Sequence, residues 1–228
     1  MVRRMAEPSL KSMGCCTSPL PKERRPTMVP RSLDQRKFHP WEGGEGKVPA
    51  QYQLARLELA KELINRKKYD DALALIDECY IYPTHLGEGK LPGAQENDCN
   101  YYKAYILQQQ GRPEEAHSLF VKACSGNSQP AAAMYYNDQK PDKIFYQGLA
   151  YRKLGEEEKA RSRFNQLITY GEEHLFDRFK MDYFAVSLPD LLIWEDDMDK
   201  KNRIHCNYLM ALGHLGLGNR TLSGRRCL

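Results

Sequence analysis

The chain has 228 residues, of which 41% are hydrophobic and 28% are charged, and its formal net charge is +4. This length is enough for one globular or solenoid domain with a core, and no second domain is required. The positive charge is uneven, because residues 1–37 carry 9 Lys or Arg against 3 Asp or Glu, whereas residues 38–218 carry 22 against 27. A basic field for nucleic acid is therefore excluded from the part expected to fold.

Cysteine usage and hydropathy set the expected compartment. The seven cysteines form an odd set without Cys-x-x-Cys spacing, so they predict neither a disulfide framework nor a zinc ribbon. Cys79, Cys124 and Cys206 fall among helical residues and are interpreted as small core side chains in a reducing compartment. The N-terminus lacks the apolar run of about seven residues found in a signal peptide, and no stretch could span a bilayer. We therefore expect a cytoplasmic protein that engages neither membrane nor nucleic acid.

The chain opens with a segment that has no periodicity. Residues 1–37 are rich in Pro, Ser, Arg and Lys, which predicts a disordered basic tail. Order is expected from residue 38, where Phe38 and Trp41 lie in a loop rich in Gly and Pro. Large apolar groups in such a loop predict that it folds back over the first helix.

Apolar residues then recur at helical spacing in successive segments. The predicted helices cover residues 50–66, 70–82, 98–110 and 113–123, and two more fall within residues 140–170 on either side of Leu154 and Gly155. Pro83 is expected to stop the second helix and Pro113 to open the fourth. The pattern predicts an all-α fold made of helix pairs.

Small side chains at helix crossings carry the repeat. Gly148 and Ala160 allow two helix axes to approach closely, while Tyr151 and Phe164 fill the space between them. Ala160 also has counterparts at Ala116 and Ala72, each separated from the next by the same forty-four residues. We therefore predict three equivalent helix pairs.

The loops between the pairs are enlarged, at residues 83–97 and 125–141, and residues 130–136 could add a helical turn. One loop sequence is itself repeated, because GEGKVPAQ at residues 44–51 recurs as GEGKLPGAQ at residues 87–95. Neither copy matches a phosphate-binding loop, which needs Ser or Thr where Val48 stands. Both copies are interpreted as architectural loops that place Lys47 and Lys90 near the following helix.

The region after residue 170 departs from the repeat. A helix over residues 172–185, a short apolar helix at DLLIW and a fourth first-of-pair helix over residues 199–217 are expected. Residues 219–228 lack the spacing of a partner helix and are predicted to form an irregular tail, so we expect the chain to be truncated half a repeat short. The acidic residues at 195–199 are interpreted as the solvated start of the last helix.

The stretch KPDKIFYQGLAYRKLGEEEKARSRFNQLITY, residues 140–170, resembles a tetratricopeptide repeat, with Gln147 replacing the usual Leu and Glu172 replacing the closing Pro. The resemblance implies a right-handed superhelical solenoid of about three and a half helix pairs. It also implies a concave groove built from the first helix of each pair. The positions expected there are Lys61, Asn65, Tyr101, Tyr105, Gln108, Phe145, Arg152, Lys153, His205 and Tyr208.

Aromatic and basic side chains on one rigid face suit an extended peptide. The open alternative is that aromatic residues such as Tyr105 and Phe145 pack between helices. The residues of the carboxylate clamp known in chaperone-binding repeats do not align here. The six histidines form no metal-ligand spacing, and no nucleophile motif is present, so neither a cofactor nor catalysis is expected.

Further motifs, including FHPWEGGEGK, YNDQKPDKIFYQGLA and DYFAVSLPDLLIWEDD, resemble the C-terminal helical region of an uncharacterised bacterial family over residues 31–218. Longer members of that family join an N-terminal β-rich, apparently carbohydrate-related domain to tetratricopeptide repeats. The resemblance implies two alternative functions. One is a protein-interaction scaffold for a peptide or that adjoining domain, and the other is an accessory fragment whose GEGK loops and acidic segment help shape a glycan site.

Overall fold

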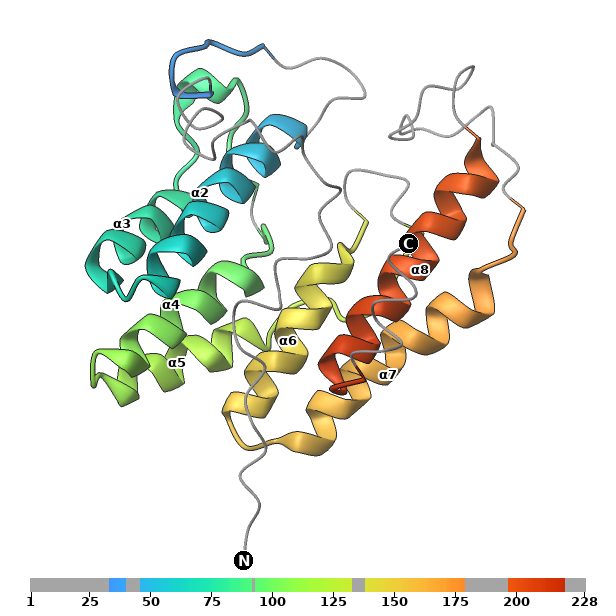
Figure 1. The fold of residues 1–228 in the computed structure, drawn as a ribbon. Coiled ribbons are helices and arrows are strands. Elements are labelled where there is room, and N and C mark those ends of the chain that lie inside the picture. Colours follow the sequence, from blue (N-terminus) through green and yellow to red (C-terminus); the bar gives the residue numbers. More distant parts are fainter. Residues whose placement is uncertain (1–32, 40–45, 92, 133–137, 179–196, 220–228) are drawn as a thin grey trace, which may run out of the picture.

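The computed structural model describes residues 33–39, 46–91, 93–132, 138–178 and 197–219. Within these ranges the chain contains seven α-helices, one short 3-10 helix and no strand (Figure 1). The α-helices are α2 (Lys47–Asn65), α3 (Tyr69–Cys79), α4 (Asn97–Gln109), α5 (Pro113–Ala123), α6 (Pro141–Lys153), α7 (Glu157–His174) and α8 (Met198–Gly216), and the 3-10 helix is η2 (Thr84–Leu86). The prediction of an all-α fold is confirmed.

Most predicted helix bounds agree with the structure to within a residue or two, and three ends differ more, those of α2, α3 and α7. Helix α2 begins at Lys47 rather than residue 50, because Pro49 falls in its first turn, where a missing N–H costs nothing. Helix α3 ends at Cys79, three residues before the predicted end. The residue before a proline avoids helical backbone angles, so the helix ends before Tyr82 and Pro83 are reached.

We predicted a separate helix over residues 172–185, and the predicted start is wrong. Helix α7 continues through residue 172 to His174, which makes it 18 residues long against 11 for α5. Its added turns pack on α8, where Gly171 lies so close that a Cβ atom would sit 2.7 Å from the carbonyl oxygen of Cys206. Residues 179–185, the predicted DLLIW helix, Trp41 and the tail from residue 220 lie outside the described residues. The predicted helical turn at residues 130–136 is absent from the described part, residues 130–132.

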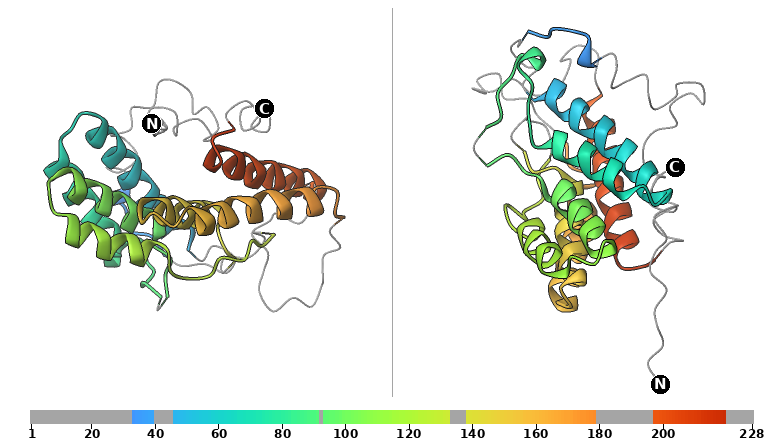
Figure 2. Two further views of the ribbon diagram at one scale, coloured as in Figure 1. Left: turned by 90° about the horizontal axis from the view of Figure 1, so that it is seen from below. Right: turned by 90° about the vertical axis from the view of Figure 1, so that its left-hand side faces the viewer.

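The helices pack as consecutive pairs. Helix α2 packs on α3, α4 on α5 and α6 on α7, while α8 packs on α7 and α6. Successive pairs also meet, since α4 contacts both α3 and α6. Figures 1 and 2 show this order, from α2 and α3 at one end of the molecule to α7 and α8 at the other. One hydrophobic cluster runs through all the pairs.

The small residues predicted at the helix crossings lie where expected. Ala72, Ala116 and Ala160 are all buried in the same cluster. At Gly148 a Cβ atom would lie 2.4 Å from the ring of Phe164, so this helix pair can approach so closely only with glycine there. The predicted contact between α6 and α7 is therefore confirmed.

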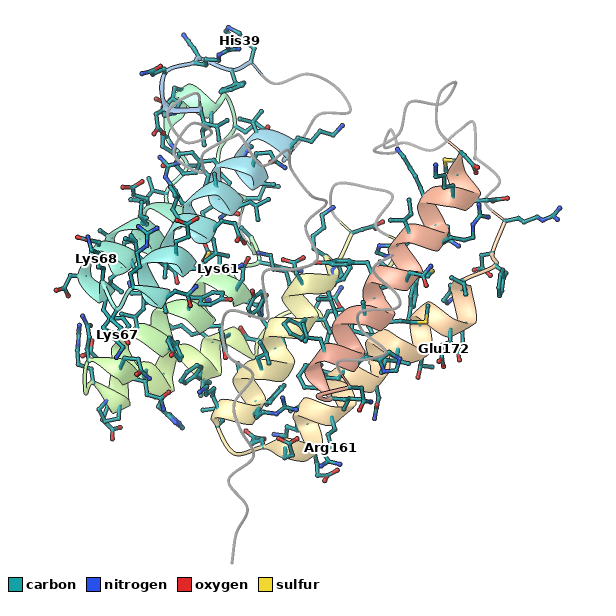
Figure 3. The ribbon with its side chains drawn as sticks, in the orientation of Figure 1. His39, Lys61, Lys67, Lys68, Arg161 and Glu172 are labelled. Atoms are coloured by element: carbon teal, nitrogen blue, oxygen red, sulfur yellow. The ribbon has the colours of Figure 1, made fainter. Side chains whose placement is uncertain are left out.

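The turn inside each helix pair contains a residue in the left-handed backbone conformation, with a positive φ angle. The φ angle is 76° at Gly111 and 81° at Gly155, and it is 60° at Lys67, the equivalent position in the first pair. Lys67 lies at an exposed turn beside Lys68 (Figure 3). A side chain in this conformation is strained, whereas glycine is not.

We expect Lys67→Gly to raise the free energy of unfolding by roughly 0.5–1 kcal/mol, because relief of the left-handed strain exceeds the entropy that glycine adds to the unfolded chain. Urea unfolding of both proteins measures the change. Lys68→Gly is the matched control, since Lys68 has a φ of −87°, and it should give no gain. A loss of stability in Lys67→Gly would contradict the assigned turn.

The N-terminal segment docks on the first pair. Leu33 and Phe38 pack against Val48, Tyr52 and Leu86, as the prediction that the loop folds back requires. The contacts begin ahead of the expected boundary at residue 38. The buried guanidinium of Arg56 forms ion pairs of 2.7 Å with Asp34 and 2.6 Å with Glu78 and lies 3.4 Å above the Tyr52 ring. Leu33 and Asp34, which fall within the predicted tail, therefore contact the first helix pair.

Amide side chains hold the ends of the second helices. Gln53 Nε2 donates to the carbonyl of Cys79 at 2.9 Å, and Asn97, at the equivalent position one repeat later, donates to that of Ala123 at 2.8 Å. These bonds satisfy carbonyls that a helix end leaves without a partner. The buried Gln147 donates to the carbonyls of Ser125 and Asn127 at 3.1 and 3.0 Å. The departure from the repeat pattern at Gln147 thus anchors the enlarged loop.

Candidate interaction surface

The two GEGK loops contact each other. The backbone N–H of Gly46 donates to the carboxylate of Glu88 at 2.7 Å, which joins the first copy to the second. Lys90 forms a 2.5 Å ion pair with Glu96, directly before α4, and donates to the carbonyl of Tyr80 at 3.2 Å. Lys47 is the first residue of α2. Both lysines thus lie at the following helix, as predicted.

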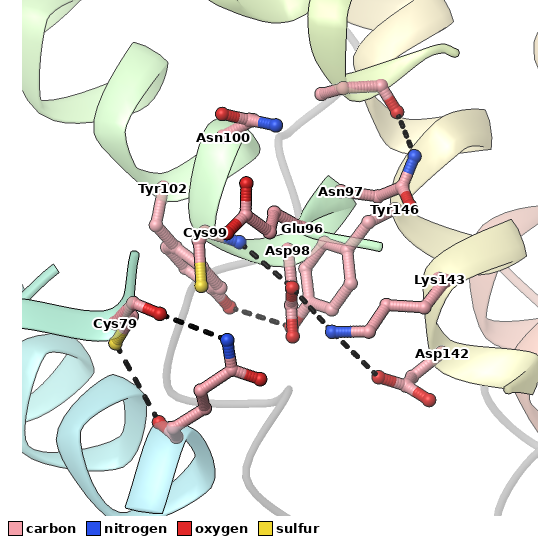
Figure 4. Close-up of polar contacts among 12 residues, drawn as sticks. Cys79, Glu96, Asn97, Asp98, Cys99, Asn100, Tyr102, Asp142, Lys143 and Tyr146 are labelled. Atoms are coloured by element: carbon pink, nitrogen blue, oxygen red, sulfur yellow. Dashed lines mark hydrogen bonds and ion pairs between the residues drawn. The ribbon is translucent and has the colours of Figure 1, made fainter. Parts of the chain in front are cut away.

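Charged side chains meet where α4 and α6 begin, as Figure 4 shows. The ammonium group of Lys143 lies 2.6 Å from Asp98 and 3.9 Å from Asp142. Asp98 also accepts from the backbone N–H of Cys99 at 2.9 Å. The side chains of Lys143 and Asp98 are only 14% and 10% exposed, so solvent screens this pair weakly. The ion pair joins the second helix pair to the third.

A tyrosine pair lies beside these charges. The hydroxyl groups of Tyr102 and Tyr146 are 3.1 Å apart, and these residues occupy equivalent positions 44 residues apart. Burial raises the pKa of both hydroxyls above 10.0. Both groups therefore stay neutral over the physiological range and act as hydrogen-bonding groups.

The surroundings also raise the pKa values of the neighbouring charged groups. Burial alone would lower the pKa of Lys143, but Asp98 and Asp142 outweigh it, so the pKa is raised above 10.5. For Asp142, burial is the largest effect and raises the pKa of the carboxyl group despite the nearby Lys143. The pKa of Lys61 is likewise raised, because Tyr102 and Glu58 outweigh the effect of burial. Both lysines therefore remain positively charged.

Lysines on α2 and α6, the helices on either side of α4, contact the tyrosine rings of α4. Lys61 on α2 forms a 2.6 Å ion pair with Glu58, and its ammonium lies 5.2 Å from the Tyr102 ring centroid. Lys153 on α6 lies 5.6 Å from the ring centroid of Tyr105. Such cation–π contacts favour a fixed arrangement of side chains. We call the resulting surface the inner strip, which comprises Glu58, Lys61, Tyr105, Lys143 and Lys153. Asp98, Tyr102 and Tyr146 contact these residues but are buried, at 7%, 0% and 7% exposed.

Of the ten residues expected in a groove, Lys61, Tyr105 and Lys153 belong to the inner strip. Asn65 and Gln108 are exposed near the ends of α2 and α4.

Four of the ten residues lie elsewhere, and the expectation for Tyr101 and Phe145 needs correction. Tyr101 and Phe145 are 8% and 3% exposed and belong to the core, as the packing alternative held for Phe145. Arg152 turns toward α7, where it bonds Glu157 at 3.1 Å. His205 bonds the carbonyl of Ala131 at 2.7 Å, on the enlarged loop. These four side chains therefore contact other residues of the same chain and do not belong to the inner strip.

The last of the ten, Tyr208, is half-buried against the core.

Sequence reasoning missed Asp98, Tyr102, Lys143 and Tyr146. A signal for them was present, because Tyr102 and Tyr146 repeat at the interval of the key alanines.

The four cysteines in the described residues are free, and Cys79, Cys99 and Cys206 are buried as core side chains. Cys124 is only half-buried. Burial raises the pKa of Cys124 to about 12 and that of Cys206 to about 11. These thiols therefore stay protonated at neutral pH, whereas a nucleophilic cysteine needs a lowered pKa.

No protein-family model matches this chain, and no solved structure matches it. In the part that the structure describes, His, Cys, Asp and Glu side chains nowhere gather in threes as ligands for a metal ion. None of the described helices has the length and apolar composition to cross a bilayer.

Proposed function

We propose that this chain is an interaction scaffold of the tetratricopeptide type, a right-handed solenoid of about three and a half helix pairs, whose inner strip docks an extended peptide or an adjoining domain. The observation that carries the proposal is the contact of charged and aromatic side chains from α2, α4 and α6. A surface that crosses several rigid helices can contact an extended ligand at several points along its length.

The electrostatics support binding rather than catalysis. Lys143 has a raised pKa, whereas a catalytic lysine needs a lowered one. The Tyr102 and Tyr146 hydroxyls also have raised pKa values, which keeps them neutral. These groups suit a preorganised surface that holds its shape when a ligand arrives.

Selection of short random peptides displayed on phage against the full chain tests the proposal, with affinities of enriched peptides measured by fluorescence anisotropy. We expect Tyr105→Ala and Lys153→Ala each to weaken these peptides about tenfold, because loss of an anchor costs more than about 1 kcal/mol. Arg203→Ala, an exposed site on α8, is the matched control and should leave affinity unchanged. A selection in which no enriched peptide is weakened by either inner-strip variant would contradict the proposal.

A glycan array run on the same protein separates the alternative function. The scaffold proposal expects no glycan binding. The GEGK loops already bond each other, and Asp197 of the acidic segment accepts from the N–H of Lys200 at 2.9 Å to cap α8. Binding to a glycan, lost on Glu88→Ala, would support the accessory role in a carbohydrate-directed protein.

A further inference from the structure

A second surface lies along α7, apart from the inner strip. It is a hollow of about 990 Å³ lined by α7 residues from Glu158 to Glu173 and by Gln129 and Pro130 of the enlarged loop. No inner-strip residue lines it. Its volume falls at the upper end of the range for ligand sites, about 300–1,000 Å³.

The hollow is long and polar. The residues from 158 to 173 span about 22 Å at 1.5 Å per helical residue. That length matches about seven residues of an extended chain. Amide and hydroxyl side chains follow one another along it, among them Asn165, Gln166 and Gln129. Such groups both donate and accept hydrogen bonds, which is what a peptide backbone requires.

Two buried polar atoms in the lining residues lack a hydrogen-bond partner. Nε of Arg163 can donate and Oε1 of Gln166 can accept, and neither has a partner among the described residues. The amide nitrogen of Gln166 already donates to Gln129 at 3.0 Å. An unsatisfied buried group costs about 1–3 kcal/mol. A peptide group carries one acceptor and one donor, so it could satisfy both atoms after a side-chain rotation.

Four charged side chains line the hollow. Arg161 and Arg163 lie toward the start of α7, and Figure 3 shows Arg161 near that end. Arg161 is 3.5 Å from Glu157, whereas Arg163 forms no ion pair with a described residue and lies 5.8 Å from the Tyr151 ring centroid. At the far end, Glu173 forms no ion pair within the described ranges. Glu158 also lines the start of the hollow, so the charged side chains run from Glu158 through Arg161 and Arg163 to Glu173.

We propose that the α7 hollow binds an extended peptide with an acidic side chain over Arg163 and a basic side chain over Glu173. The ten positions from Arg163 to Glu173 correspond to about 15 Å along the helix. An extended chain covers that distance in about four or five residues, which sets the spacing of the two charges. This second binding site does not depend on ligand binding at the inner strip.

Display selection on the full chain provides the test, read with variants of the hollow. We expect enriched peptides with an acidic and a basic residue about four or five positions apart. Arg163→Ala and Glu173→Ala should each weaken them about tenfold, the equivalent of 1.4 kcal/mol. The Arg163→Glu protein should not bind these peptides, because two negative charges would then face each other. It should bind them again when their acidic residue is changed to Lys. Arg203→Ala is again the control, and circular dichroism melting checks that each variant is folded.

The outcomes separate the two proposals. Peptides weakened by the hollow variants but not by Tyr105→Ala support the α7 site. A selection whose enriched peptides all respond only to Tyr105→Ala or Lys153→Ala supports the inner strip and overturns the α7 site. A selection that yields no peptide weakened by Arg163→Ala or Glu173→Ala also overturns it.

Discussion

Phe164→Ala is expected to lower the free energy of unfolding by about 3–5 kcal/mol, the range for a fully buried aromatic residue. The ring lies between two helices that both carry glycine against it. A Cβ atom at Gly148 on α6 would lie 2.4 Å from the ring, and one at Gly216 on α8 would lie 2.2 Å from it. Removing the ring would leave a cavity among α6, α7 and α8 that rigid helices cannot close.

A double-mutant cycle makes this expectation specific. In the wild-type protein, Gly148→Ala should cost about 1–3 kcal/mol, because the added methyl group overpacks against the Phe164 ring. In the Phe164→Ala protein the same change should stabilise by up to about 1 kcal/mol, since the space is free and alanine favours the helix. Urea unfolding of the four proteins gives the coupling energy. Equal effects of Gly148→Ala in both backgrounds would contradict the assigned helix register.

Lys143→Met is expected to cost about 3–5 kcal/mol, because it leaves the buried Asp98 carboxylate without its charged partner. Asp98→Asn added to Lys143→Met should recover most of that loss, since the uncompensated charge is then gone. Equilibrium unfolding of the two single variants and the double variant measures this. An additive loss in the double variant would show that the pair does not hold α4 and α6 together.

The pH dependence of the same cycle has a defined sign. The pKa of Lys143 is raised above its ordinary 10.5 in the folded protein. Its contribution to stability is therefore complete below that value and is lost only as the pH rises through the higher folded-state pKa. The difference between wild type and Lys143→Met should thus be the same at pH 7 and pH 9. A difference that disappears between these values would contradict the buried ion pair.

Local signals predicted the helices well. Helix α5 spans Pro113–Ala123, the predicted range, because a first-turn proline and the spacing of small and apolar residues define it within one segment. The length of α7 could not be predicted in this way. Its last turns are stabilised by α8, through the close contact at Gly171, and α8 lies beyond a further stretch of chain. Contacts between distant segments decide such an end.

The surface was predicted less well, for a geometric reason. Tyr101 and Tyr102 are adjacent, as are Phe145 and Tyr146, and adjacent helical residues point about 100° apart. Sequence alone shows an aromatic residue at both positions of each pair. In the structure all four are buried in the core, where the Tyr102 and Tyr146 hydroxyls bond each other between neighbouring pairs.

The central claim is that equivalent positions of successive helix pairs lie side by side. The amide of Gln95 donates to that of Gln139, 44 residues further along the chain. Mild oxidation of a Gln95→Cys, Gln139→Cys protein should therefore form a disulfide between these positions, identified by peptide mass mapping. A Gln109→Cys, Gln139→Cys control should not link, because residue 109 ends α4, about 18 Å along the helix from its first residue, Asn97. A helical, folded protein without the 95–139 disulfide would contradict the stacked arrangement and the inner strip that depends on it.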